Sequence, residues 1–159
     1  MFFLHFWYNM KNIILLGATG SIGSQVLDII EQNPNEYTLK AFSFGHNISK
    51  ALEIIDKFKP EFVCSPFDEI EYIKNVKTTK DLKEIVLFGD NSYYVVNAIV
   101  GINGLIPTLE CIKANKVLLL ANKESLVMAG ELVNKLCKEY NGIIVPIDSE
   151  HSALYQLIS

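Results

Sequence analysis

Apolar residues alternate along this chain between two kinds of segment. Some form short unbroken runs, at residues 12–17, 37–44, 61–65, 93–100, 116–122 and 142–148. Others recur every three or four positions, in segments that start near residues 22, 52, 105 and 126. Unbroken runs are typical of strands buried on both faces of a sheet, and the spaced residues are typical of one face of a helix. The alternation predicts an α/β fold, a doubly wound parallel sheet of Rossmann-like type with helices on both faces.

Two segments do not follow this pattern. Residues 68–91 are the least regular, and we predict a weak strand at Tyr72–Val76 and a helix from Lys80 to about Phe88. The first nine residues, MFFLHFWYN, are aromatic and carry no lysine or arginine. They are too short for a membrane helix and lack the features of a signal peptide. We therefore expect residues 1–9 to be an extension outside the fold.

Composition narrows the class of protein further. Half of the 159 residues are apolar and the net charge is −4, as in an ordinary globular domain, so we expect no nucleic acid and no membrane as partner. The three cysteines form no CxxC pair, which favours buried thiols in a cytoplasmic protein over disulfides or a zinc site. All fourteen basic residues are lysines, so an anion site must use lysine, hydroxyl groups or backbone N–H groups.

A glycine turn follows the first predicted strand. The sequence GATGSIG places Gly17, Gly20 and Gly23 at the junction of a strand and a helix. This spacing is typical of dinucleotide sites, where glycines allow a tight turn, close approach of the pyrophosphate and close helix packing. Thr19, Ser21 and the helix N-terminus would supply donors to the anion. The alternative is that the glycines serve only the turn and its packing.

The second predicted strand indicates which dinucleotide binds. NAD enzymes usually have an acidic residue after this strand, to bind the ribose 2′-hydroxyl. Residues 38–52 contain no acidic residue and include the loop FGHNISK, with His46, Asn47 and Lys50. This favours a 2′-phosphate and therefore NADPH. For His46 the alternative is a plain loop residue, with Gly45 supplying a turn.

Two further polar clusters follow later strands, and both positions face the edge where doubly wound sheets bind ligands. Asn122, Lys123 and Glu124 follow the run at 116–122, where they would contact a ligand or simply begin a helix. Asp148 and Glu150 follow the last run, and carboxylates of this kind suit Mg²⁺ or Mn²⁺. The alternative there is that Asp148 or Ser149 caps a helix.

Four motifs resemble those of the 1-deoxy-D-xylulose 5-phosphate reductoisomerases: GATGSIGSQVLDII, NAIVGINGLIPTL, LLLANKESLVMAG and PIDSEHSALYQ. They occur in the family's order and span the chain from Met10 to its end. The resemblance implies an NADPH- and metal-dependent enzyme. It converts 1-deoxy-D-xylulose 5-phosphate, a small sugar phosphate, to 2-C-methyl-D-erythritol 4-phosphate in non-mevalonate isoprenoid biosynthesis.

The resemblance also implies a role for each matching residue. The cofactor residues would be Gly17, Thr19, Gly20, Ser21, Ile22, Gly45, His46, Asn47, Asn122 and Glu124. The substrate residues would be Lys123, Ser149 and Glu150, and the metal ligands Asp148 and Glu150. Of these, Lys123, Asp148 and Glu150 would be catalytic. The full-length enzyme is expected to be a homodimer.

The chain departs from the family in two respects. The family often has Lys or Arg where His46 stands, so NADPH affinity would be weaker or pH-dependent, because histidine changes charge near neutral pH. The family's catalytic domain also continues past Ser159. We therefore expect an NADPH-binding domain at 10–147, the beginning of the metal and substrate domain at 148–159, and no turnover by this piece alone.

Two other classes of Rossmann-fold reductase lack their catalytic residues in this sequence. A short-chain dehydrogenase also uses a GATGxxG turn, but it needs Tyr-x-x-x-Lys, and no tyrosine here has a lysine four residues on. A semialdehyde dehydrogenase needs a nucleophilic cysteine, and none of the three cysteines has an evident motif. The remaining alternative is an NADP(H)-binding Rossmann module without turnover.

Overall fold

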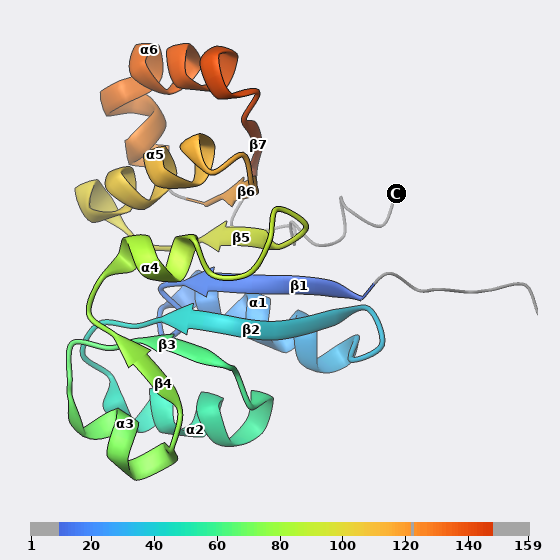
Figure 1. The fold of residues 1–159 in the computed structure, drawn as a ribbon, viewed down its shortest axis with the longest axis vertical. Coiled ribbons are helices and arrows are strands. Elements are labelled where there is room, and N and C mark those ends of the chain that lie inside the picture. The colour runs from blue at the N-terminus through green and yellow to red at the C-terminus, as the bar shows by residue number, and fades with distance from the viewer. Residues whose placement is uncertain (1–9, 122, 148–159) are drawn as a thin grey trace, which may run out of the picture.

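The protein forms a sheet of seven strands, and each strand runs parallel to its neighbours (Figure 1). The computed structural model describes residues 10–121 and 123–147, with the backbone alone at 71–73. The strands are β1 (Lys11–Leu16), β2 (Tyr37–Ser43), β3 (Phe62–Cys64), β4 (Lys77–Thr79), β5 (Tyr94–Asn97), β6 (Val117–Leu120) and β7 (Ile143–Pro146). The α/β fold with a parallel sheet is thus confirmed.

The order of strands across the sheet is β4-β3-β2-β1-β5-β6-β7. The chain builds outward from β1 in one direction and then returns to add β5 on the other side of β1. Connections that leave two neighbouring strands in opposite directions open a crevice at the carboxyl ends of those strands. The ends of β1 and β5 are therefore where a ligand site is expected.

Helices connect the strands and cover both faces of the sheet (Figure 1). The helices are α1 (Ser21–Gln32), α2 (Ile48–Phe58), α3 (Glu69–Lys74), α4 (Leu82–Val86), α5 (Leu105–Lys113) and α6 (Lys123–Tyr140), with a 3₁₀ turn at Gly101–Gly104. No helix in the described ranges is both long and apolar enough to cross a membrane.

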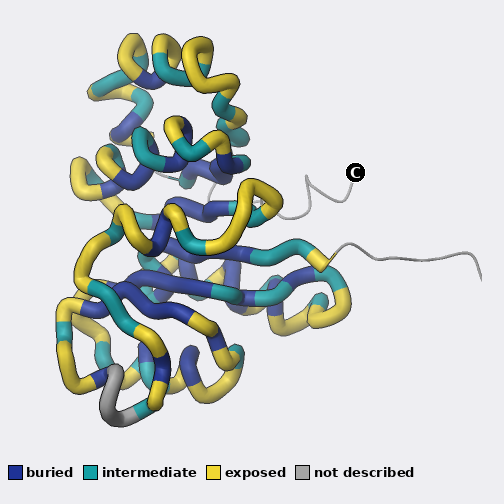
Figure 2. The backbone as a smooth tube through the Cα atoms, in the orientation of Figure 1, coloured by how far each residue is buried: buried dark blue, intermediate teal, exposed yellow. Residues whose placement is uncertain are grey.

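The core has two parts, one on each face of the sheet. Ile13 and Leu15 of β1 pack into the part that includes α1 and α2, whereas Ile14 and Leu16 pack into the part that includes α4 and α5. Successive side chains of a strand point to opposite faces, so a strand covered on both faces must be apolar throughout. Figure 2 shows this central layer as buried along much of its length.

The region 68–91 differs from its prediction. The strand predicted at Tyr72–Val76 is wrong, because helix α3 extends to Lys74 and the strand β4 begins only at Lys77. Asn75, in the left-handed conformation with φ 51°, follows the last residue of this helix. The predicted helix at 80–88 is present but shorter, as α4, and the side chain of Asp81 caps it by accepting from the backbone N–H of Lys83 at 2.8 Å.

Candidate dinucleotide site

The glycine turn after β1 is shaped by close backbone contacts. Gly17 has φ +78°, and a Cβ atom there would lie 2.9 Å from the carbonyl oxygen of Ala98. A Cβ atom on Gly23 would lie 2.3 Å from the carbonyl oxygen of Gly17. Gly17 thus allows β1 to turn beside β5, and Gly23 allows α1 to begin against the turn. These are two of the roles that the sequence predicts for the glycines.

Helix α1 begins at this turn with an uncovered N-terminus. Its N-cap residue is Gly20, no side chain caps it, and its first turn has no acidic residue. The hydroxyl of Ser24 donates to the carbonyl oxygen of Gly20 at 2.7 Å and so does not compete for the first N–H groups. Such a helix end attracts anions, because its first N–H groups have no partner within the helix. Gly20, Ser21 and Ile22 all line the neighbouring cleft.

The loop after β2 is tied to the glycine turn. The backbone N–H of Gly17 donates to the Ser43 hydroxyl at 3.0 Å, and that of Ala18 donates to the Ser43 carbonyl at 2.9 Å. Residues 45–47 are exposed. The side chain of Asn47 caps helix α2 by accepting from the backbone N–H of Lys50 at 3.1 Å. Gly45 has open space around its Cβ position, so packing does not require a glycine there.

A cleft of about 1160 Å³ lies at these carboxyl ends of the strands. It is lined by residues of the glycine turn, the β2–α2 loop, the ends of β3 and β4, and the segment after β5. They are Gly17, Gly20, Ser21, Ile22, Ser43, Phe44, Gly45, His46, Cys64, Pro66, Lys80, Leu82, Ala98, Ile99, Val100, Ile102, Asn103, Leu105, Ile106 and Pro107. This set contains no acidic residue and is mostly apolar, so the cleft suits a ligand that combines rings with anionic groups.

A smaller pocket of about 230 Å³ adjoins this cleft. Its lining shares Ile22 and residues 98–100 with the larger cleft and adds Ala121, Lys123 and Glu124. Lys123 and Glu124 are exposed and begin helix α6. The structure therefore brings these two predicted residues to the same end of the cleft as Ile22 of α1.

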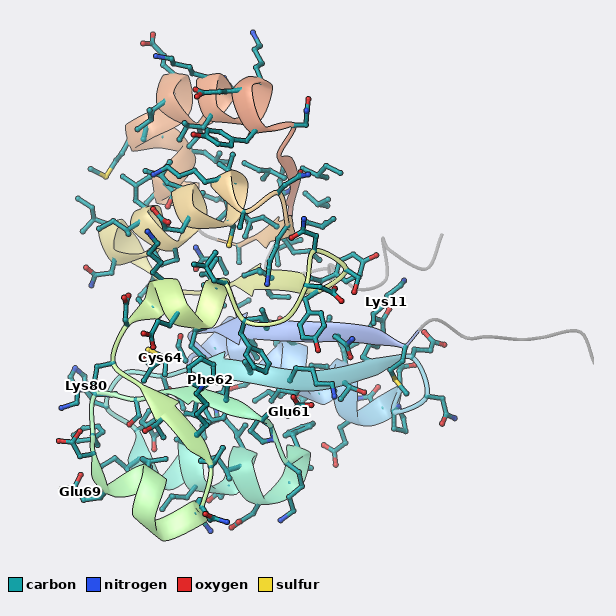
Figure 3. All side chains as sticks on the ribbon, viewed as in Figure 1. Lys11, Glu61, Phe62, Cys64, Glu69 and Lys80 are labelled. Carbon is teal, nitrogen blue, oxygen red and sulfur yellow. The ribbon has the colours of Figure 1, made fainter. Side chains whose placement is uncertain are left out.

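Two side chains of the cleft wall that sequence reasoning did not single out are Cys64 at the end of β3 and Lys80 just after β4 (Figure 3). Burial raises the pKa of the Cys64 thiol to about 11, so at neutral pH it is a protonated apolar wall rather than a nucleophile. The Lys80 ammonium lies 2.9 Å from the Asp68 carboxylate in an exposed ion pair.

The segment after β5, which forms part of the cleft wall, is held in place by the side chain of Asn97. This side chain is wholly buried, donates to the Gly104 carbonyl at 2.9 Å and the Thr108 hydroxyl at 3.0 Å, and accepts from the Ile99 backbone N–H at 3.2 Å. It thereby fixes the loop that carries Val100, Ile102 and Asn103 into the cleft wall. The signal for it in the sequence is a single amide residue inside the otherwise apolar and aromatic run 93–100.

Four of the predicted site residues lie outside the described residues: the cofactor residue Asn122, the substrate residue Ser149, and the metal ligands Asp148 and Glu150. Within 10–121 and 123–147, no three histidine, cysteine or acidic side chains are grouped so that they could hold a metal ion.

Comparison with known proteins places the chain in a family. Residues 13–130 match the family described as 1-deoxy-D-xylulose 5-phosphate reductoisomerase. The chain is 48% identical to the reductoisomerase of Clostridium acetobutylicum, with 94% of this chain and 42% of the relative covered. It is 45% identical to that of Bacillus pumilus, with 94% of this chain and 41% of the relative covered. The chain thus spans about two fifths of the length of these relatives.

A solved structure agrees with the sequence comparison. A DOX-P reductoisomerase in complex with NADPH, fosmidomycin and magnesium is 40% identical and superposes with a TM-score of 0.78, over 92% of this chain and 38% of that chain. A homoserine dehydrogenase of S. aureus, 24% identical with a TM-score of 0.55, shares the fold alone. With a family match over residues 13–130 and the same arrangement of strands and helices, this chain belongs to the 1-deoxy-D-xylulose 5-phosphate reductoisomerase family.

Proposed function

We propose that this chain is the NADPH-binding part of an enzyme that converts 1-deoxy-D-xylulose 5-phosphate to 2-C-methyl-D-erythritol 4-phosphate. The observation that carries the proposal is the cleft itself. The cleft lies between the uncapped N-terminus of α1 and an exposed loop without acidic residues. The relatives of the chain are 1-deoxy-D-xylulose 5-phosphate reductoisomerases. NADPH was bound in the similar solved structure.

The parts of NADPH would lie in order along the cleft. The pyrophosphate would lie over Gly20, Ser21 and Ile22, where the first N–H groups of α1 are directed to the cleft. The adenosine 2′-phosphate would lie near His46 and Asn47, with Thr19 and Gly45 on either side. The nicotinamide, which supplies the hydride, would lie toward the smaller pocket beside Glu124. The resemblance to the family adds Asn122 as a further cofactor residue.

The residues beyond β7 would begin the second part of the site. We assign residues 10–147 to the NADPH-binding domain and 148–159 to the start of the metal and substrate domain. Asp148 and Glu150 would hold Mg²⁺ or Mn²⁺, which as a Lewis acid polarises the substrate's oxygens. Ser149, Glu150 and Lys123 would contact the substrate. A homodimer and a cytoplasmic location stay predictions from the resemblance and the composition.

Titration of the purified 159-residue chain with NADPH and with NADH, followed by nicotinamide fluorescence, tests the cofactor assignment. We expect NADPH to bind at least about 10-fold more tightly, because none of the described residues that line the cleft is acidic and would repel a 2′-phosphate. Equal or tighter binding of NADH would refute the NADPH assignment, and binding of neither would refute the dinucleotide site.

A second assay tests whether this chain alone can catalyse the reaction. The 159-residue chain, given 1-deoxy-D-xylulose 5-phosphate, Mn²⁺ and NADPH, should not oxidise NADPH, because it spans only 41% of the length of a relative such as the Bacillus pumilus enzyme. Turnover that depends on substrate would show that the described cleft and residues 148–159 suffice for catalysis.

A further inference from the structure

Lys50 connects the two loops that form the adenosine end of the cleft. It lies in the first turn of α2, just after the exposed residues 45–47. Its side chain turns back toward the glycine turn, where its ammonium contacts the carbonyl oxygen of Thr19 at 3.4 Å and the hydroxyl of Ser24. Lys50 therefore links the loop after β2, through its backbone N–H to Asn47, with the glycine turn and the start of α1, through its ammonium.

Among the residues that the structure describes, no carboxylate forms an ion pair with Lys50. Other lysines of the chain are paired: Lys40 with Glu61 at 2.6 Å, Lys57 with Glu31 at 2.6 Å and Lys74 with Asp56 at 2.7 Å. In the described ranges, Lys50 takes part in no such ion pair, and its two side-chain partners are neutral oxygens. An ammonium group has three N–H donors, so these partners leave one for a further acceptor. Lys50 does not itself line the cleft, but Thr19, which its ammonium contacts, directly precedes the lining residue Gly20. A half-buried cation at this place attracts an anion toward the glycine turn.

The position of Lys50 in the fold indicates whether it would contact the adenosine 2′-phosphate or the pyrophosphate. In a doubly wound sheet, the adenosine ribose lies at the end of β2 and the pyrophosphate lies over the start of α1. Lys50 belongs to the unit that follows β2. The exposed side chains of the preceding loop, His46 and Asn47, carry no permanent positive charge.

We propose that Lys50 is a specificity-determining residue, whose fixed positive charge makes this site prefer a dinucleotide with a 2′-phosphate. The inference rests on the proposed dinucleotide function and adds the residue that selects between the two dinucleotides. In the absence of the ligand, Lys50 holds its place by its contacts with Thr19 and Ser24, so the charge is positioned before binding.

The test measures dissociation constants of NADPH and NADH for the 159-residue chain and four variants: Lys50→Gln, Lys50→Arg, Lys57→Gln and Ser24→Ala. Lys50→Gln should weaken NADPH binding at least about 10-fold, the value of a hydrogen bond to a charged group, and change NADH binding less than about 3-fold. Lys50→Arg keeps the charge and should keep the preference. The matched control is Lys57→Gln, on the same helix but paired with Glu31, and it should change neither constant.

A purely structural role would give a different result. If Lys50 only tied α2 to the glycine turn, Lys50→Gln would weaken both dinucleotides equally, and that result would overturn the inference, as would no change in either. Ser24→Ala removes one tether and keeps the charge, so the NADPH preference should survive in it. Loss of that preference in Ser24→Ala would also overturn the inference, and this variant can be measured even if Lys50→Gln does not fold.

Two smaller nucleotides test whether Lys50 acts on the 2′-phosphate. Adenosine 2′,5′-bisphosphate should lose affinity in Lys50→Gln, whereas 5′-AMP should not, because only the first carries the 2′-phosphate. Should the unsubstituted chain bind NADPH and NADH while Lys50→Gln leaves their ratio unchanged, only the role of Lys50 is refuted. Should the unsubstituted chain bind neither, the proposed function fails and this inference fails with it.

Discussion

Replacing Gly23 with alanine is the sharpest test of how the glycine turn is built. Gly23 lies in α1, where alanine is ordinarily the better residue. The added Cβ atom, however, would lie 2.3 Å from the carbonyl oxygen of Gly17 and 2.7 Å from the Cα atom of Ala18. Both atoms belong to the backbone, so no side chain can rotate away to make room. Helix α1 would have to move away from the turn.

The two effects have opposite signs and known sizes. Alanine in place of glycine inside a helix contributes about 1 kcal/mol. Forcing an extra carbon into a closely packed site costs about 1–3 kcal/mol, and contact with rigid backbone places this case at the upper end. We therefore expect Gly23→Ala to lower the free energy of unfolding by about 2 kcal/mol. That is a large share of the roughly 5–15 kcal/mol that stabilises an ordinary domain.

Urea unfolding followed by far-ultraviolet circular dichroism measures this change. Gly130 in α6 provides the matched control, because nothing lies within 4 Å of its Cβ position. Gly130→Ala should leave stability unchanged or slightly higher. The reasoning is wrong if Gly23→Ala unfolds within about 0.5 kcal/mol of the unsubstituted chain, the usual range of a harmless substitution. It is also wrong if the two variants lose stability equally.

Three further predictions concern other parts of the chain. Asn97→Ala should lower the free energy of unfolding, measured with urea, by about 3 kcal/mol, because three hydrogen bonds of a wholly buried side chain are lost. A decrease below about 1 kcal/mol would contradict its role in holding the cleft wall. Burial lowers the pKa of Lys116 below the usual 10.5, so the folded chain holds this proton less tightly than the unfolded chain. The contribution of Lys116 to stability should therefore rise as the pH approaches 10.5 from below, and Lys116→Met should abolish that rise; identical pH profiles of unfolding would exclude it. In an enzyme with the full length of the relatives, Asp148→Asn should strongly reduce turnover but leave NADPH affinity nearly unchanged, since we propose that this carboxylate binds the metal. Near-normal turnover with saturating Mg²⁺ would instead indicate that Asp148 only caps a helix.

The parts of the fold that sequence could predict are those decided by local chemistry. Strand β1 is apolar at both faces because helices cover both. The glycine turn follows because only glycine fits at positions 17 and 23. Strand β4 was missed because Lys77–Thr79 is short, polar and partly exposed. It is a strand because its backbone pairs with β3, with Phe62 opposite Lys77, and that pairing leaves no pattern in the sequence.

The cleft depends on strand order, which spacing along the chain does not reveal. Gly17 and Ala98 meet because β5 is inserted beside β1 after the chain has built the opposite half of the sheet. The same order brings the segments after β1, β2 and β5 to one edge. It thereby makes a single ligand site from motifs that look independent in the sequence. Side-chain direction is a second unknown: the loop sequence offers Lys50 to a 2′-phosphate, but only the structure shows its ammonium at Thr19 and Ser24. Residue types therefore indicate which chemistry is available, and topology decides which of those residues act on the same ligand.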